Sequence, residues 1–391
     1  MARILTGAQV RMARVRAQRL AGPPGADAHD VVAGLLAVPA QDTRASRLAV
    51  RPRSRGTGVD AAAVVRACNQ ERSLVRTWLL RDTLHMAAAE DVGWLVALLG
   101  PVFAAGGAPR RLRLGLDEDT LTRGLQALRE VLAGGPLTRA ALVEAVAAMG
   151  LALDPRSQAP AHLVSYAAKQ GLLCRGPDLQ GEEPTYVLLD DWVQRPARST
   201  PAATLQQDPE AALGELARRY LRAHGPASDA DFAAWSGLPL RQARRGFQQL
   251  AAAGELDTVD AAGTPAATLA GSAPPSDEEP PGAGAPHLRL LGHFDAYLLG
   301  YRNRDLVLAP RFANRIQAGG GIIHPAILLD GRVAGTWHQH RAHDLLTVIA
   351  GPFGGEGLTA ATLPALEAEV ADVGRFLGVQ AALRVTSETS E

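Results

Sequence analysis

The chain has 391 residues, of which 47% are apolar and 20% charged, and acidic and basic residues are equal in number. A chain of this length is expected to form several domains rather than one core. It has no run of about eighteen apolar residues, no apolar signal segment at its start, and only two cysteines, too few for a disulfide framework. These features argue against a membrane-spanning or disulfide-rich protein and predict a cytoplasmic one.

Positive charge is concentrated in the first third of the chain. Residues 1–116 hold 17 arginines and 8 acids, a net charge of +9, so the remainder carries −9. Lys169 is the only lysine, so nearly every positive charge is an arginine. Codon bias in a GC-rich genome produces the same preference for arginine without any function. The clustering predicts a polyanionic partner.

An apolar stretch ends at Pro39 and is followed by an arginine-rich segment. Proline has no N–H and disfavours helical geometry at the residue before it, so a helix over residues 30–38 should stop here. The break would deliver Gln41 and Asp42 to a junction between two helices. Further helices are expected over residues 43–50 and 60–69, and a hairpin from strands at residues 75–80 and 84–87.

The same order of helices and a hairpin recurs twice. In the second copy, Thr138 opens one helix, a second helix ends at Gly171, and two strands follow at residues 172–175 and 185–189. In the third copy, Ser228 caps a helix, a turn at residues 237–239 contains glycine, and a second helix covers residues 240–253. This order is typical of a winged helix.

Three arginines of the third copy, Arg241, Arg244 and Arg245, share one face of its second helix because of their spacing. They either contact nucleic acid or solvate an ordinary surface. Residues 260–286 are rich in Ala, Pro, Gly and Ser and are predicted to form a long wing or linker.

The last hundred residues have short β segments. Strands are expected at residues 288–291, 326–329, 333–337 and 345–349, with a two-residue hairpin turn at Asp330-Gly331, and a helix over residues 362–377. A small barrel or curved sheet should result. The whole chain is therefore divided into four domains, at residues 1–105, 106–200, 201–286 and 287–391.

Four longer blocks carry a resemblance to a known family. They are GLLAVPAQDTRASRLAVRPR (34–53), RSLVRTWLLRDTLH (72–85), LLGHFDAYLLGYRNR (290–304) and GGGIIHPAILLDGRVAGTW (319–337). With them the chain resembles the AlkZ/YcaQ-like family of winged-helix DNA glycosylases. The resemblance implies an α+β fold with three tandem winged helices and a C-terminal β-barrel-like domain, which enclose a concave DNA-binding channel.

The resemblance also implies an activity: cleavage of the N-glycosidic bond of alkylated purines, notably N7-alkylguanines, including bulky adducts and interstrand crosslinks. The expected partner is double-stranded DNA with alkylated bases, bound by a monomer without a cofactor or metal. Such an enzyme serves base excision repair, or protects a producer from its own DNA-alkylating antibiotic.

The family carries a Gln-x-Gln or Gln-x-Asp catalytic motif, and this chain departs from it. Gln41 takes the second position, whereas Pro39 occupies the first, and a proline side chain neither donates nor accepts a hydrogen bond. Two alternatives therefore stay open: a catalytically silent protein that only binds DNA or a lesion, and a transcriptional regulator that uses the arginine face of the third copy.

The chemistry needs little from the protein, because N7-alkylation already makes guanine a good leaving group. A carboxamide such as Gln41 can stabilise an oxocarbenium-like sugar and place a water molecule. Asp42 is either a general base or a helix N-cap.

The remaining candidates are expected to contact DNA or to complete the fold. Trp78 should lie in the core, His85 is either channel-facing or buried, and Asp295 either approaches the channel with Phe294 or anchors a turn. His338, His340 and His343 have only crude metal-ligand spacing, and no metal is expected. The candidate DNA contacts are Arg44, Arg47, Arg51, Arg53, Arg55, Thr77, Arg81, His85, Arg241, Arg244 and Arg245.

Overall fold

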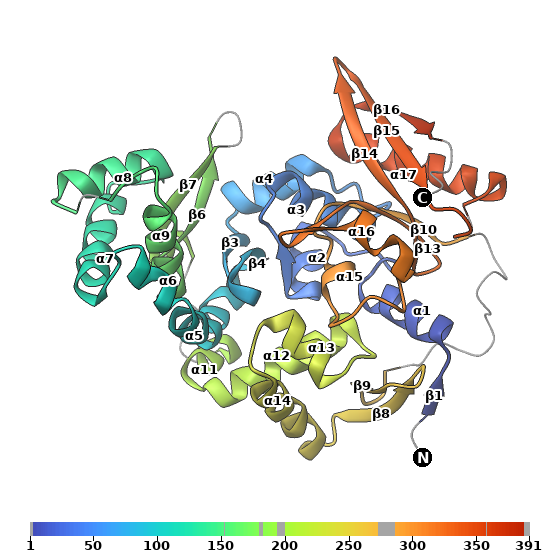
Figure 1. Ribbon diagram of the computed structural model, residues 1–391, viewed down its shortest axis with the longest axis horizontal. Helices are drawn as coiled ribbons and strands as arrows, with labels where there is room; N and C mark the ends of the chain where they lie inside the picture. The colour runs from blue at the N-terminus through green and yellow to red at the C-terminus, as the bar shows by residue number, and fades with distance from the viewer. Residues whose placement is uncertain are drawn as a thin grey trace. The chain divides into compact units, whose positions relative to one another are not determined.

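The computed structural model describes residues 3–151, 153–179, 183–193, 200–272, 286–356 and 358–386. The chain divides into two compact units, each of which mixes helices and strands (Figure 1). One unit combines residues 1–64 with residues 214–391, and the other holds residues 65–213. The four-domain division remains a prediction.

The segment around Pro39 changes from helix to strand earlier than expected. The helix α2 ends at Leu35, because Leu36 adopts a positive φ of 67° that a helix cannot contain. A short buried strand, β2, then carries the chain through Pro39, so the predicted helix over residues 30–38 is corrected at its end. The elements here are β1 (Arg3–Leu5), α1 (Gly7–Ala17), α2 (Ala28–Leu35), β2 (Ala37–Pro39), α3 (Thr43–Val50), η1 (Arg51–Arg53) and α4 (Ala61–Asn69).

The third predicted copy forms a helix-turn-helix followed by a hairpin. Ser228 and Asp231 form a capping box at the start of α13, and Gly237 ends that helix with a φ of 80°. The hairpin extends into the predicted linker, of which residues 273–285 lie outside the described residues. A strand that was not expected, β1, pairs in parallel with β8. The elements are α12 (Pro209–His224), α13 (Asp229–Ser236), α14 (Leu240–Ala252), β8 (Leu256–Ala261) and β9 (Pro265–Leu269).

The C-terminal strands form a curled half-barrel sheet of order β10-β13-β14-β15-β16 (Figure 1). The expected turn at Asp330-Gly331 has both residues at positive φ, 47° and 77°. The last strand was missed; it lies parallel to β15, and α17 makes the crossover. The elements are β10 (Leu288–Leu291), α15 (Ala296–Leu299), η4 (Pro310–Phe312), α16 (Ala313–Ile316), β11 (Gln317–Gly319), β12 (Ile322–Ile323), β13 (Ala326–Leu329), β14 (Arg332–Ala342), β15 (Leu345–Pro352), η5 (Ala360–Thr362), α17 (Leu363–Leu377) and β16 (Gln380–Val385).

The second unit places its strands in the order β4-β3-β6-β7-β5. Thr138 caps its helix as expected, and Gly171 has a φ of 71° after the next helix. The helix α5 has the length and composition of a membrane span. Half of it is buried, however, and it crosses α9 so closely that a Cβ on Gly100 would lie 2.1 Å from the carbonyl oxygen of Lys169. The elements are β3 (Leu74–Trp78), η2 (Leu80–Asp82), β4 (Leu84–Ala88), α5 (Ala89–Gly106), α6 (Ala108–Arg113), α7 (Glu118–Leu132), β5 (Leu137–Thr138), α8 (Arg139–Ala148), α9 (Ala159–Lys169), β6 (Leu173–Asp178), β7 (Pro184–Leu188), α10 (Leu189–Trp192) and α11 (Pro201–Gln207).

Candidate active site and DNA interface

Gln41 and Asp42 lie at the exposed start of α3. The side chain of Asp42 caps the helix, because its Oδ1 accepts a hydrogen bond of 2.8 Å from the backbone N–H of Ala45. Pro39 and Ala40 are buried immediately before them. The break in the chain at Pro39 therefore presents the neutral amide of Gln41 to solvent at a helix start. The N-cap interpretation accounts for the position of Asp42.

Two of the predicted phosphate contacts are inside the protein instead. The guanidinium of Arg53 is fully buried and donates to both carboxylate oxygens of Asp295, at 2.8 and 2.9 Å. It also donates to the backbone oxygen of Ala49 at 2.7 Å and to two oxygens of Gln18, each at 3.0 Å. We correct the prediction for Arg53, since a side chain with all five of its N–H donors occupied inside the core cannot reach DNA.

Arg51 is buried in a second ion-pair network. It donates to Glu369 at 2.8 Å, to Asp372 at 2.7 Å and to the backbone oxygen of Leu290 at 2.7 Å. Burial alone would lower the pKa of Arg51, but the adjacent carboxylates of Glu369 and Asp372 raise it. The prediction of a phosphate contact is therefore corrected for Arg51 as well.

The other arginines of this segment are closer to solvent. Arg44 is exposed and Arg47 is half-buried, each with polar or electrostatic contacts of its own. Arg55 is half-buried, and its Nη1 lies 3.4 Å from Glu369. Phosphate contacts by Arg44, Arg47 and Arg55 remain predictions.

The β3–β4 hairpin of the second unit buries two predicted contact residues. Thr77 and His85 are partners across the two strands, and both are fully buried. Burial lowers the pKa of His85 to about 3, with a further contribution from Arg81. A neutral, enclosed imidazole and an enclosed hydroxyl do not contact phosphate, so Thr77 and His85 are corrected. Arg81 lies in the half-buried turn with a φ of 53°.

Three candidates occupy the second helix of the helix-turn-helix. Arg241, Arg244 and Arg245 are exposed on α14, and Arg244 lies 3.1 Å from Asp229 on the preceding helix. The opposite side of α14 packs inward through Ala243, Gly246 and Leu250. The arrangement fits an interface with a polyanion.

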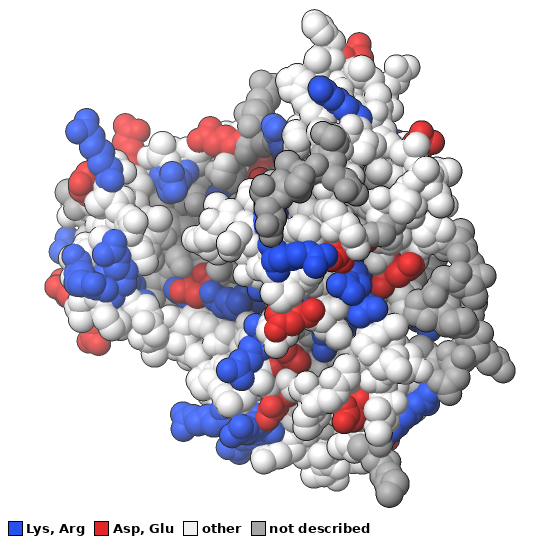
Figure 2. All heavy atoms as spheres, turned by 45° about the vertical axis from the view of Figure 1, so that its right-hand side comes forward, with Lys and Arg blue, Asp and Glu red and all other residues white. Residues whose placement is uncertain are grey.

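The basic excess of the first third is only partly a surface property. Figure 2 shows basic and acidic side chains interspersed over the face in view. The arginines taken into the interior by ion pairs, hydrogen bonds or aromatic stacking include Arg14, Arg51, Arg53, Arg76 and Arg111. The net charge counted along the sequence therefore overstates the positive charge that is available to DNA at the surface.

In the turn between β10 and α15, sequence reasoning singled out Phe294 and Asp295 but not His293. Asp295 is buried, caps α15 and binds Arg53, so the anchoring interpretation holds. Just before it, His293 is half-buried, and its ring centroid lies 5.6 Å from that of His324. Phe294, which lies between His293 and Asp295 in the chain, has a φ of 56°. A positive φ at a phenylalanine is a strained conformation, and such strain is a structural signal of a functional site that the sequence could not reveal.

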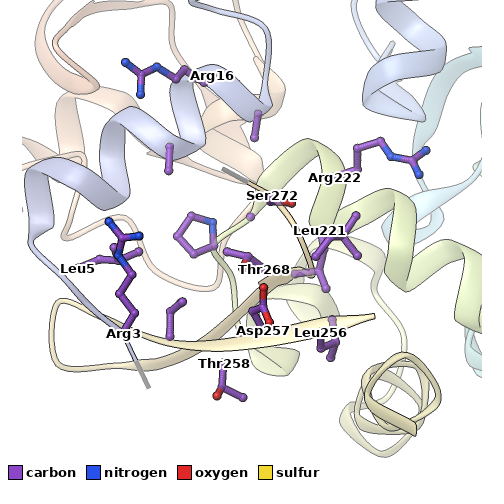
Figure 3. Close-up of a pocket in the computed structure, with 16 residues that line it drawn as sticks. Arg3, Leu5, Arg16, Leu221, Arg222, Leu256, Asp257, Thr258, Thr268 and Ser272 are labelled. Atoms are coloured by element: carbon purple, nitrogen blue, oxygen red, sulfur yellow. The ribbon is translucent and has the colours of Figure 1, made fainter. Parts of the chain in front are cut away.

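A cavity lies elsewhere, between the N-terminal segment and the β8–β9 hairpin. It encloses about 690 Å³, and Arg3, Arg16, Arg222 and Asp257 are among its lining residues. In Figure 3 the side chains of Arg16 and Arg222 extend to opposite sides of it. None of the predicted catalytic or DNA-contacting residues is among those that line it. Among the residues that the structure describes, no group of three or more His, Cys, Asp or Glu is arranged to hold a metal ion.

A helix-turn-helix with an arginine face and an amide exposed at a helix start are together typical of a DNA-binding protein with a candidate catalytic centre. Comparisons with known proteins give the family. A model of the DNA glycosylase AlkZ-like family matches residues 32–376. The chain is 30% identical over 392 residues to the interstrand DNA cross-link repair glycosylase of Streptomyces sahachiroi, covering 95% of this chain and 96% of that protein.

The structure leads to the same family. It is similar to the solved structure of Streptomyces sahachiroi DNA glycosylase AlkZ, with a TM-score of 0.76 and 27% identity, covering 98% of this chain and 100% of that chain. The chain belongs to the AlkZ-like DNA glycosylase family, as the four sequence blocks indicated.

Proposed function

We propose that the protein is a monofunctional DNA glycosylase that hydrolyses the N-glycosidic bond of alkylated purines, N7-alkylguanine above all. The cationic base leaves with the electrons of the C1′–N9 bond and becomes neutral. Gln41 stabilises the oxocarbenium-like sugar through its amide oxygen and orients the attacking water. Pro39 takes no part in this step.

The observation that carries the proposal is the exposure of Gln41 at the start of α3. The neighbouring carboxylate is engaged as the N-cap, and the residues before it are buried. Gln41 is thus the polar side chain that this segment offers to a ligand, at the second position of the family motif. An amide is sufficient here, because the alkylated base leaves without protonation.

We further propose that three winged helices and the C-terminal half-barrel form the DNA-binding surface. The exposed arginines of α14 support this for the third copy, as do Arg44 and Arg47 near the candidate catalytic residue. We expect a monomer that acts in the cytoplasm, where it would serve base excision repair or protect a producer of a DNA-alkylating antibiotic.

The relatives extend the substrate range of the proposal. The similar protein of Streptomyces sahachiroi is named for the repair of interstrand DNA cross-links. We propose that this chain also acts on bulky N7-guanine adducts and cross-links. An exposed amide at a helix start, rather than one at the bottom of a deep pocket, is compatible with lesions too large to be flipped.

The test is base release from a duplex panel with N7-guanine adducts of increasing size. The purified protein should produce alkali-sensitive abasic sites and free alkylguanine, and Gln41→Ala should abolish most of this release without weakening DNA binding. Release by Gln41→Ala at the wild-type rate would remove Gln41 from the mechanism.

A catalytically silent lesion-binding protein is the second candidate, and Pro39 favours it. The side chain at position 39 is buried in β2 and has no polar atom, so nothing there replaces the first motif glutamine. This candidate predicts tight binding to alkylated duplex and no base release from any adduct in the panel.

A further inference from the structure

Gln41 leaves one requirement of the reaction unmet. A carboxamide orients water but does not accept its proton, because a protonated amide is far too acidic to form at neutral pH. Protonation of Asp42 would weaken the N-cap hydrogen bond to Ala45. The base must therefore come from another segment of the same unit that lies near the start of α3.

The segment from β10 to α15 runs along α3 toward that helix start. Leu290 lies beside the far end of α3, where its carbonyl oxygen accepts from Arg51 at 2.7 Å. Two residues on, a Cβ built on Gly292 would lie 3.4 Å from the Cβ of Leu48 and 3.8 Å from the carbonyl oxygen of Ala45. Between Leu290 and Gly292 the chain therefore passes from the guanidinium of Arg51, which follows the last residue of α3, to the side of α3 formed by Ala45 and Leu48.

The segment then turns back. Asp295 is again beside the far end of α3, because it binds Arg53, which also donates to the carbonyl oxygen of Ala49. Gly292 makes the contact of this segment nearest the start of α3, and His293 and Phe294 follow it directly before the chain turns back. Of the two, only His293 is titratable, and its half-buried side chain keeps contact with solvent.

The hydrogen bond of His293 sets its tautomer. Its Nδ1 lies 3.2 Å from the carbonyl oxygen of Ile323, and a carbonyl only accepts, so Nδ1 carries the proton. The lone pair is therefore on Nε2, the nitrogen that a general base uses. The backbone N–H of Phe294 donates to the same oxygen at 3.2 Å, which holds the turn in its strained positive-φ conformation.

We propose that His293 is the general base of the proposed glycosylase reaction. This inference rests on the proposed function. The C1′–N9 bond breaks, and its electrons neutralise the alkylated base. The oxygen of a water oriented by Gln41 forms the new bond to C1′, while Nε2 of His293 accepts a proton of that water. The resulting imidazolium then returns this proton to solvent.

The decisive variant is His293→Asn. An asparagine Nδ2 occupies nearly the position of Nδ1 and can donate to Ile323, so the turn is retained, but the basic Nε2 is gone. We expect the single-turnover rate of N7-methylguanine release to fall by about 10²-fold, with the Kd for the same duplex within twofold. His338→Ala, an exposed histidine on β14, is the matched control and should keep the wild-type rate.

His293→Ala gives a second readout. Removal of the ring leaves room for a small base, so added imidazole should raise the rate of His293→Ala at least tenfold. Imidazole should not stimulate the wild type or His293→Asn. His324→Ala should reduce the rate less than tenfold, because the proton of the attacking water is accepted by His293 and not by His324.

Four outcomes decide the inference. Loss of rate in His293→Asn with retained DNA affinity and imidazole rescue of His293→Ala would establish it. A wild-type rate in His293→Asn overturns it and leaves the proposed function standing. Loss of rate without any rescue of His293→Ala also overturns it, since a positioning role gives that result. A wild-type protein that binds the duplex and releases no base overturns the proposed function and this inference together.

Discussion

Replacement of Asp295 by alanine should destabilise the unit that contains α3 more than any surface substitution. Arg53 uses five hydrogen bonds, and two of them go to Asp295 at 2.8 and 2.9 Å. Both side chains are fully buried. Asp295→Ala would strand a guanidinium in the interior, with two donors and a full charge uncompensated. Removal of one partner from a buried pair costs about 3–5 kcal/mol.

The assay is urea denaturation followed by tryptophan fluorescence, since Trp337 belongs to the same unit and donates to the backbone oxygen of Leu291, four residues before Asp295. Asp295→Ala should lower the free energy of unfolding by about 3–5 kcal/mol. The exposed pair Arg244–Asp229 is the control, and Asp229→Ala should change stability by less than about 1 kcal/mol.

The double variant Arg53→Met with Asp295→Leu should lose less stability than Asp295→Ala, because it removes both charges together. A loss below about 1 kcal/mol in Asp295→Ala would refute the reasoning. It would mean that Arg53 reaches water in solution, and its predicted role as a phosphate contact would be restored.

Gln41→Ala should lower the rate of base release by about 10²-fold in single-turnover assays with little change in Kd, as removal of a transition-state contact does. Arg241→Gln and Arg245→Gln should each weaken duplex binding and reduce the slope of log K against log salt by about 1. His85 stays neutral in the fold because burial lowers its pKa to about 3. The unfolded state therefore binds a proton that the folded state does not between pH 6.5 and 3. Stability should fall as pH drops through this window, by at most about 1.4 kcal/mol per unit, and His85→Leu should reduce that slope.

Local rules were sufficient to predict the helices and hairpins of the three repeated segments and the C-terminal helix, but not α1, α5, α7 or α12. The caps at Thr138, Ser228 and Asp42 use side-chain oxygens whose preference for helix starts is intrinsic. The turn at Asp330-Gly331 adopts the positive φ angles that these residue types favour. The family followed from blocks long enough to be specific, independently of any single structural assignment.

Tertiary contacts were beyond the same reasoning. The sequence of an arginine segment is the same whether the side chain faces DNA or a buried carboxylate, and the carboxylate partners of Arg51 and Arg53 lie more than two hundred residues away. For the same reason β1 and β16 were missed: each is a short strand that exists through its pairing with a distant or parallel partner. His293 is positioned by a turn in which Phe294 has a positive φ, and a phenylalanine in the sequence does not predict that strain.

The proposed function requires this chain to cleave an N-glycosidic bond despite Pro39. The direct measurement is incubation of the purified protein with a duplex that contains one N7-methylguanine, followed by chromatography of the released base and detection of abasic sites. We expect free N7-methylguanine at a rate well above spontaneous depurination, with one abasic site per base released. Tight binding of the same duplex with release at the spontaneous rate would contradict it.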